Sequence, residues 1–169
     1  MSSPRNSGRL LKRRYSRKNC KARNLNKADS PTRLIKMPKL TDKGRHMLTK
    51  DDLTRYERQI LYTGFGEKGQ KRLKQSHVVV AGLGGLGCTA SLYLTCTGVG
   101  HITLIDCDRV ELSNLNRQIL HYEEDIGEEK PISAARKLAK LNSSIEVTPV
   151  FKKITERNAR EIIKGANLV

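Results

Sequence analysis

Residues 106–118 bring together side chains that are suited to binding phosphate. They read DCDRVELSNLNRQ and follow directly after a short apolar run. Arg117 can hold two phosphate oxygens with its planar guanidinium, and Asn114 and Asn116 can add hydrogen bonds. Because ligands of open α/β sheets bind at the carboxyl ends of strands, this stretch predicts an anion-binding site at the edge of a sheet.

A glycine-rich turn precedes that stretch. Residues 82–87 read GLGGLG, between a run of β-branched residues and a helical pattern. Gly82 allows a tight turn, Gly84 lets the backbone approach a phosphate, and Gly87 lets the helix pack closely on the strand. Asp106 follows Gly87 by 19 residues, where an acid can accept hydrogen bonds from ribose hydroxyls. This pattern predicts nucleotide binding but does not separate NAD from ATP.

The elements that must position these residues alternate between strand and helix. Such alternation predicts an α/β fold with a Rossmann-like, doubly wound and mainly parallel sheet. The sheet is expected to be incomplete at its C-terminus, because a fourth strand would only begin at 167–169. Strands are expected at 77–81, 101–105 and 145–150, and helices over a segment ending near 97, over 131–141 and over 155–164.

Two shorter helices are expected ahead of the first strand. Thr49 is the predicted N-cap of the first, with two aspartates in its first turn. Leu53, Tyr56, Ile60 and Leu61 would share one helical face. The second helix is expected over 68–75.

The basic charge lies almost entirely at the N-terminus. Residues 1–46 hold 15 Lys and Arg and two Asp, so they carry +13 of the net +16. With few large apolar residues, this segment is expected to be a disordered basic tail, and residues 47–169 a near-neutral domain. The tail could be a nucleic-acid-binding arm, a transit peptide, or upstream sequence ahead of a start at Met47, and the last reading is favoured.

Cysteine usage and hydropathy exclude several classes of protein. The four cysteines form no Cys-x-x-Cys pair, so neither a zinc knuckle nor a redox motif is expected. Scattered single cysteines suit a reducing compartment, and a cytoplasmic protein is expected. No run of about 18 apolar residues predicts a membrane span.

Four motifs in order resemble those of the ThiF/HesA/MoeB family of adenylyltransferases, relatives of the ubiquitin-activating enzymes. They are RYERQI at 55–60, VVVAGLGGLG at 78–87, the block DCDRVELSNLNRQ at 106–118 and DIGEEK at 125–130. The similarity covers residues 48–169, which is all of the organised sequence. Family membership implies a nucleotidyltransferase that uses ATP to adenylylate the C-terminal carboxylate of another protein.

The resemblance also implies roles for individual residues. Arg117, Lys130 and Arg58 would be catalytic, with Lys130 at the α-phosphate and Arg58 reaching the γ-phosphate from the neighbouring subunit. Gln118 would support the site. The residues implied to bind the nucleotide are Gly82, Gly84, Gly85, Gly87, Asp106, Ser113, Asn114, Leu115, Asn116, Arg117 and Lys130.

Other roles stay open when the residues are taken alone. Lys130 could be a solvated surface lysine beside Glu128 and Glu129. Asp108 and Glu111 could shape a turn or bind a cation.

The expected cofactors are ATP and Mg²⁺. The aspartate that holds Mg²⁺ in the family would lie beyond Val169, so no metal ligand is assigned, and the chain is expected to be a truncated fragment that is inactive alone. The expected partners are a ubiquitin-like or sulfur-carrier protein ending in Gly-Gly and a second copy in a homodimer, with no membrane and with nucleic acid only through the tail. Alternatives are an NAD(P)-dependent oxidoreductase and the non-catalytic half of a heterodimeric activating enzyme.

Overall fold

Helices and strands alternate through residues 47–169, the part of the chain that the computed structural model describes. The predicted basic tail, residues 1–46, lies outside the described residues. The elements in chain order are α2 (Lys50–Arg55), α3 (Glu57–Ile60), α4 (Gly66–Gln75), β1 (His77–Ala81), α5 (Gly85–Thr97), β2 (His101–Asp106), the 3₁₀ helices η1 (Leu112–Asn114) and η2 (Glu123–Asp125), α6 (Lys130–Leu141), β3 (Glu146–Phe151) and α7 (Ala159–Ile162).

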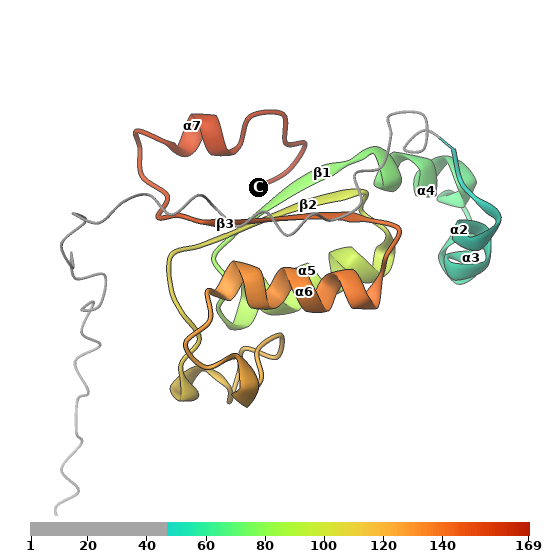
Figure 1. The fold of residues 1–169 in the computed structure, drawn as a ribbon. Helices are drawn as coiled ribbons and strands as arrows, with labels where there is room; N and C mark the ends of the chain where they lie inside the picture. Colours follow the sequence, from blue (N-terminus) through green and yellow to red (C-terminus); the bar gives the residue numbers. More distant parts are fainter. Residues whose placement is uncertain (1–46) are drawn as a thin grey trace, which may run out of the picture. The chain divides into compact units, whose positions relative to one another are not determined.

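The three strands form one parallel sheet in the order β1-β2-β3 (Figure 1). His101 of the central strand β2 lies opposite His77 of β1 and Glu146 of β3. The four inner residues of β2 are all buried, as expected for a strand covered on both faces. Burial alternates along β3, and its Pro149 suits a strand that has one neighbour within the described residues.

The helices cover the two faces of the sheet as a doubly wound fold requires. α5 and α6 pack against each other and on the same face, and α7 lies on the opposite side (Figure 1). After α7 the chain returns to β1, where the Val79 N–H donates to the Leu168 carbonyl over 2.9 Å. The parallel bridge between Val78 and Leu168 is the start of the expected fourth strand. The predicted Rossmann-like α/β fold is therefore confirmed.

The first helix differs from its prediction. It begins as expected, because the Thr49 hydroxyl accepts the Asp52 N–H over 3.1 Å in a capping box. It breaks at Tyr56, however, where α2 ends and α3 begins. A Cβ on Gly98 would lie 2.5 Å from the Tyr56 ring, whereas Leu61 is 68% exposed. The close packing of the Tyr56 ring against the end of α5, rather than a continuous apolar stripe, determines where the helix breaks.

The helix predicted at 155–164 is also wrong in length. Only Ala159–Ile162 is helical, and most of the surrounding segment is exposed. Asn158 accepts the Thr155 N–H over 2.7 Å and donates to the Lys153 carbonyl over 2.9 Å. These side-chain bonds compete with helical ones, and little apolar burial supports further turns. The remaining boundaries agree to within one or two residues.

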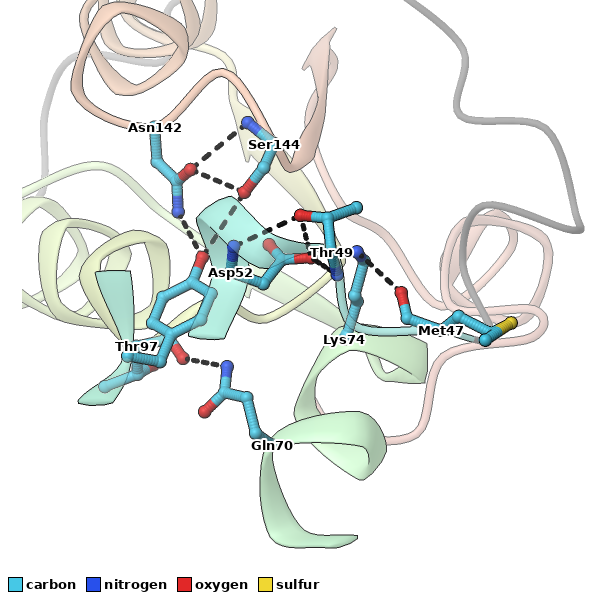
Figure 2. Close-up of polar contacts among 9 residues, drawn as sticks. Met47, Thr49, Asp52, Gln70, Lys74, Thr97, Asn142 and Ser144 are labelled. Carbon is cyan, nitrogen blue, oxygen red and sulfur yellow. Dashed lines mark hydrogen bonds and ion pairs between the residues drawn. The ribbon is translucent and has the colours of Figure 1, made fainter. Parts of the chain in front are cut away.

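A buried ion pair anchors α2 to α4 (Figure 2). The Lys74 ammonium donates to the Asp52 carboxylate and, over 3.0 Å, to the Met47 carbonyl. The carboxylate also accepts from the backbone N–H and hydroxyl of Thr49, over 2.8 and 2.9 Å. The side chains of Asp52 and Lys74 are 2% and 7% exposed. Burial raises the pKa of Asp52, but the bonds from Lys74 and Thr49 outweigh it and hold that pKa below its ordinary value.

Further buried polar contacts tie the same helices to the C-terminal end of α5 (Figure 2). The Asn142 side-chain amide donates to the Tyr56 hydroxyl over 2.8 Å and to the Thr95 carbonyl over 2.9 Å. The Gln70 amide donates to the Thr97 carbonyl over 3.0 Å. The segment that carries Arg58 is thus held at one defined end of α5.

We expect Asp52→Ala to lower the free energy of unfolding by about 3–5 kcal/mol, because it leaves the buried Lys74 charge unpaired. The folded-state pKa of Asp52 is depressed, so its contribution is present above the unfolded pKa near 4 and is lost as the pH falls through the folded value. Urea titrations between pH 7 and pH 3 measure both effects. Asp51→Ala, an exposed carboxylate of the same helical turn, should change the unfolding free energy by about 0.5 kcal/mol or less. Equal losses for the two variants would contradict the assignment.

Among residues 47–169, no helix has the length and apolar content needed to cross a bilayer.

Candidate functional site

The glycine turn joins the end of β1 to the start of α5, as the sequence predicts. Gly82 has a φ of 95°, which only glycine adopts readily. A Cβ on Gly87 would lie 1.8 Å from the Gly82 carbonyl oxygen, so the close approach of helix and strand requires glycine there. A Cβ on Gly84 would meet nothing within 4 Å, so the backbone at Gly84 borders open space. The α5 N-terminus beside it presents backbone N–H groups that an anion can accept from.

Asp106 ties this turn to the end of β2. Its Oδ2 accepts the Leu83 N–H over 2.6 Å, and its Oδ1 accepts the Asp108 N–H over 2.8 Å. The side chain is half-buried. Asp106 therefore shapes the glycine turn directly, and its predicted contact with a ribose would have to share these oxygens.

Arg117 lies against the glycine turn. A Cβ on Gly85 would be 3.4 Å from the Arg117 carbonyl oxygen and 3.7 Å from its Cγ. Its Nη1 donates to the Ser113 carbonyl and to Asn116 Oδ1, both over 2.9 Å. Nη2 and Nε have no partner within residues 47–169, so these donors are available to a phosphate.

The segment just before Arg117 is held by a cap. Asn114 is buried, and its Oδ1 accepts the Glu111 N–H over 3.1 Å. Glu111 accepts in return from the Asn114 backbone, so it has the turn-shaping role left open above. The amide nitrogen of Asn114 makes a longer contact of 3.4 Å with Ser113 Oγ. Of the predicted phosphate contacts in this segment, Ser113 and Asn116 are exposed and Leu115 is half-buried.

Lys130 lies in the interior, so the alternative interpretation that it is a solvated surface lysine is wrong. Its side chain is 6% exposed, and its Nζ lies 3.4 Å from Asp108 Oδ2. An antiparallel bridge between Arg109 and Glu129 and a bond from the Lys130 N–H to the Asp108 carbonyl (3.1 Å) align the two segments. A buried ammonium whose one carboxylate partner among residues 47–169 is 3.4 Å away is suited to an incoming anion.

Arg58 lies far from these groups within its own chain. Its neighbour Gln59 donates to the carbonyl of Thr97, the last residue of α5, over 2.9 Å. The glycine turn is at the other end of α5, and a helix rises about 1.5 Å per residue. The length of α5, about 18 Å over its 13 residues, therefore lies between the glycine turn and the carbonyl that the neighbour of Arg58 contacts. The described chain does not bring Arg58 together with Arg117 and Lys130.

The acidic cluster after β2 does not fit Mg²⁺. Asp106, Cys107 and Asp108 place one potential ligand atom each within 4.8 Å of one another. Both Asp106 oxygens accept backbone N–H groups, Asp108 pairs with Lys130, and a cysteine sulfur is a poor ligand for this hard cation.

One buried residue close to the site was not predicted. His121 is 3% exposed, and its Nε2 lies 3.8 Å from Cys88 Sγ on α5. His121 is an isolated histidine that fits neither a hydrophobic period nor the spacing of a known motif. No signal in the sequence could therefore have identified it.

We expect Gly84→Ala to fold normally and to bind ATP at least about tenfold more weakly. The added methyl group meets nothing in the free protein but would occupy the space that a phosphate needs. Thermal unfolding and ATP titration measure the two properties. Gly87→Ala is the matched contrast, because its methyl group clashes with the Gly82 carbonyl and should disturb folding itself. Unchanged ATP affinity in Gly84→Ala would place the nucleotide elsewhere.

Comparisons with known proteins agree with this geometry. Residues 56–169 match the model of the ThiF family. The chain is 46% identical over 122 residues to the adenylyltransferase and sulfurtransferase MOCS3 of Culex quinquefasciatus, covering 72% of this chain and 28% of that protein. It is 44% identical over 122 residues to the molybdopterin-synthase adenylyltransferase of Salmonella typhimurium, covering 72% of this chain and 49% of that protein.

Among solved structures, the tRNA N6-threonylcarbamoyladenosine dehydratase TcdA of E. coli in complex with ATP superposes with a TM-score of 0.66 at 30% identity, covering 71% of this chain and 49% of that one. The chain thus spans about half or less of the length of these relatives. Two thirds of the chain match one family model, over the segment that contains every described site residue. The chain belongs to the ThiF family.

Proposed function

We propose that the protein uses ATP to adenylylate the C-terminal carboxylate of a ubiquitin-like or sulfur-carrier protein. The observation that carries the proposal is the pair of cations at the glycine turn, Arg117 against Gly85 and the buried Lys130 beside Asp108. A triphosphate and a carboxylate are both anions, so a site that brings them together must supply positive charge. The Salmonella relative is an adenylyltransferase, and the similar structure of TcdA holds ATP; the first supports adenylyl transfer and the second supports ATP binding.

In the proposed reaction, an oxygen of the carrier carboxylate attacks the α-phosphorus of ATP. A new P–O bond forms, the bond to the bridging oxygen breaks, and pyrophosphate leaves with its electron pair. No general base is required, because a carboxylate is ionised at neutral pH. Lys130 would balance charge on the α-phosphate and Arg117 on the outer phosphates, while the α5 N-terminus donates backbone N–H groups. Asp106 would hold the ribose.

The remaining roles are proposed from the same site. Arg58 would come from a second copy of the chain in a homodimer, because the length of α5, about 18 Å, lies between the carbonyl that its neighbour contacts and the glycine turn of its own chain. The carrier is proposed to end in Gly-Gly, as the resemblance to the ThiF/HesA/MoeB adenylyltransferases implies. Mg²⁺ is proposed to accompany ATP, and the compartment is proposed to be the cytoplasm.

Exchange of labelled pyrophosphate into ATP tests the function directly. The full-length protein should catalyse exchange only when a carrier protein with a free C-terminal carboxylate is present. A carrier whose terminus is amidated serves as the matched control, because it keeps every other contact. Exchange that is independent of the carrier, or absent with every sulfur carrier and ubiquitin-like protein of the source organism, would overturn the proposal.

An NAD(P)-dependent oxidoreductase is the second candidate, because the glycine turn and Asp106 would also suit a dinucleotide. The two cations oppose it, since the pyrophosphate of NAD is held largely by the turn itself. Competition binding decides: ATP should displace a fluorescent ATP analogue at least about tenfold more tightly than NAD or NADP. A non-catalytic half of a heterodimer would bind ATP but show no exchange on its own.

A further inference from the structure

A continuous chain of buried polar groups runs beneath the glycine turn. The Lys137 ammonium donates to Ser133 Oγ over 3.0 Å, and Ser133 Oγ lies 2.9 Å from His121 Nδ1. His121 Nε2 lies 3.8 Å from Cys88 Sγ, whose thiol donates to the Leu83 carbonyl over 3.2 Å. Cys88 and Ser133 are fully buried, and His121 is 3% exposed. The chain links three segments that are far apart in sequence.

The ends of this chain are the two halves of the nucleotide site. Leu83 belongs to the glycine turn, and its N–H is the one that Asp106 accepts. Ser133 lies one helical turn after Lys130 on α6. His121 contacts both sides, through Cys88 of α5 and Ser133 of α6.

The hydrogen-bond directions are determined by the ends of the chain. The Leu83 carbonyl can only accept, and it takes the single proton of the Cys88 thiol. The Cys88 sulfur can therefore only accept from His121, so Nε2 carries the proton. Nδ1 of the neutral ring must then accept, and Ser133 is its donor. Ser133 also faces Asp125, but that carboxylate is already bound by Lys137, by Arg136 and by the Tyr122 N–H.

The charges around the ring keep it neutral. Burial lowers the pKa of His121, and Lys137 and Lys130 lower it further, whereas the Leu83 carbonyl and Asp125 act in the opposite direction. The Cys88 thiol is fully buried and burial raises its pKa, so Cys88 and His121 are not a nucleophilic pair.

We propose that His121 is a positioning residue of the adenylylation site. In its Nε2-protonated form it donates to the Cys88 sulfur, whose thiol donates to the Leu83 carbonyl, and it accepts from Ser133. It thereby holds the glycine turn and Lys130 at the separation that a triphosphate requires. This inference rests on the proposed function.

Paired substitutions separate the two ring nitrogens. In His121→Gln the amide nitrogen takes the place of Nε2 and keeps the bond to the Cys88 sulfur. In His121→Asn the shorter amide reaches only toward Ser133. We expect the KM for ATP in pyrophosphate exchange to stay within about threefold of the wild type in His121→Gln and to rise about tenfold in His121→Asn. The KM for the carrier protein should change by about twofold or less in both variants.

The pH profile adds a readout that a purely structural role would not move. Protonation of Nδ1 below the ordinary imidazole pKa of 6.5 removes the acceptor for Ser133, as His121→Gln does. The wild-type KM for ATP should therefore rise toward the value of His121→Gln, by about threefold or less, as the pH falls through the lowered pKa. The groups facing the ring are Lys130 and Lys137 of α6, Asp125 of η2 and Cys88 of α5. The profile of His121→Gln should lack this rise.

A third measurement is independent of the proposed function. Nitrogen NMR shifts of the His121 ring at pH 7 should show a protonated Nε2 and an unprotonated Nδ1, and Ser133→Ala should change the Nδ1 signal. This measurement tests the tautomer in the wild-type protein, so it remains decisive even if both histidine variants fail to fold. The opposite tautomer, equal KM values for ATP in the two variants, or a parallel rise in the KM for ATP and carrier would overturn the inference. A wild type without exchange but with the expected tautomer would instead count against the proposed function alone.

Discussion

Arg117→Ala should abolish adenylate formation. The Arg117 backbone carbonyl and the base of its side chain lie against Gly85 of the glycine turn, its side chain is exposed, and its Nη2 and Nε are without partners within residues 47–169. Loss of a charge-assisted, bidentate contact should weaken ATP binding by about 2 kcal/mol and should slow pyrophosphate exchange about a hundredfold or more. Isothermal titration and the exchange assay measure these two losses separately.

Two further variants interpret that result. Arg117→Lys keeps the charge but loses the planar fork, so it should recover part of the ATP affinity and little of the exchange rate. Lys140→Ala removes an exposed positive charge at the far end of α6 and should leave both unchanged. If Arg117→Ala exchanged pyrophosphate at the wild-type rate, Arg117 would have no role at the phosphates.

Two inactive variants should restore activity when their subunits are mixed. Arg58→Ala removes the arginine proposed to act on the neighbouring site, and Lys130→Ala removes the cation of the chain's own site. In a mixed dimer, one site then has both Lys130 and the partner's arginine, and the other site has neither. An equal mixture that exchanges subunits at random should recover about one quarter of the wild-type exchange rate.

A mixture that stays inactive would contradict the proposed role of Arg58 on the neighbouring site. If Arg58 acted within its own chain, every site in the mixture would lack one cation, and the mixture would be as inactive as either parent. Such a result would require Arg58 to reach its own glycine turn along the length of α5, about 18 Å. Arg55→Ala, an exposed arginine of α2 that contacts the Leu141 carbonyl, is the control for a general effect of removing charge from this segment.

Most elements of the sheet could be predicted because their signals are local. The β-branched run of β1, the glycine at the Gly82 turn and the proline at the start of α6 act through their own backbone conformations and immediate neighbours. Strand and helix boundaries in this region agree with the structure to within one or two residues. The parallel direction of the strands followed from the alternation itself, because parallel neighbours need a crossover connection.

Predictions that depended on packing were less successful. One helix became two because the Tyr56 ring fills the space left by Gly98, and these residues are 42 positions apart in the sequence. α7 is short because its segment has little to pack against.

The amino-acid sequence by itself determined that a glycine turn, an acid after the second strand and a cluster of phosphate-binding side chains would meet at the carboxyl edge of a parallel sheet. Only the tertiary structure decided which of these groups lie close together, which are buried and which already accept hydrogen bonds. It buries Lys130 beside Asp108, occupies both oxygens of Asp106, and places His121 between the glycine turn and α6. It also separates Arg58 from all of them. The physical reason is that turns and strand propensities act over a few residues, whereas burial and pairing of charges arise between segments that meet only when the chain has folded.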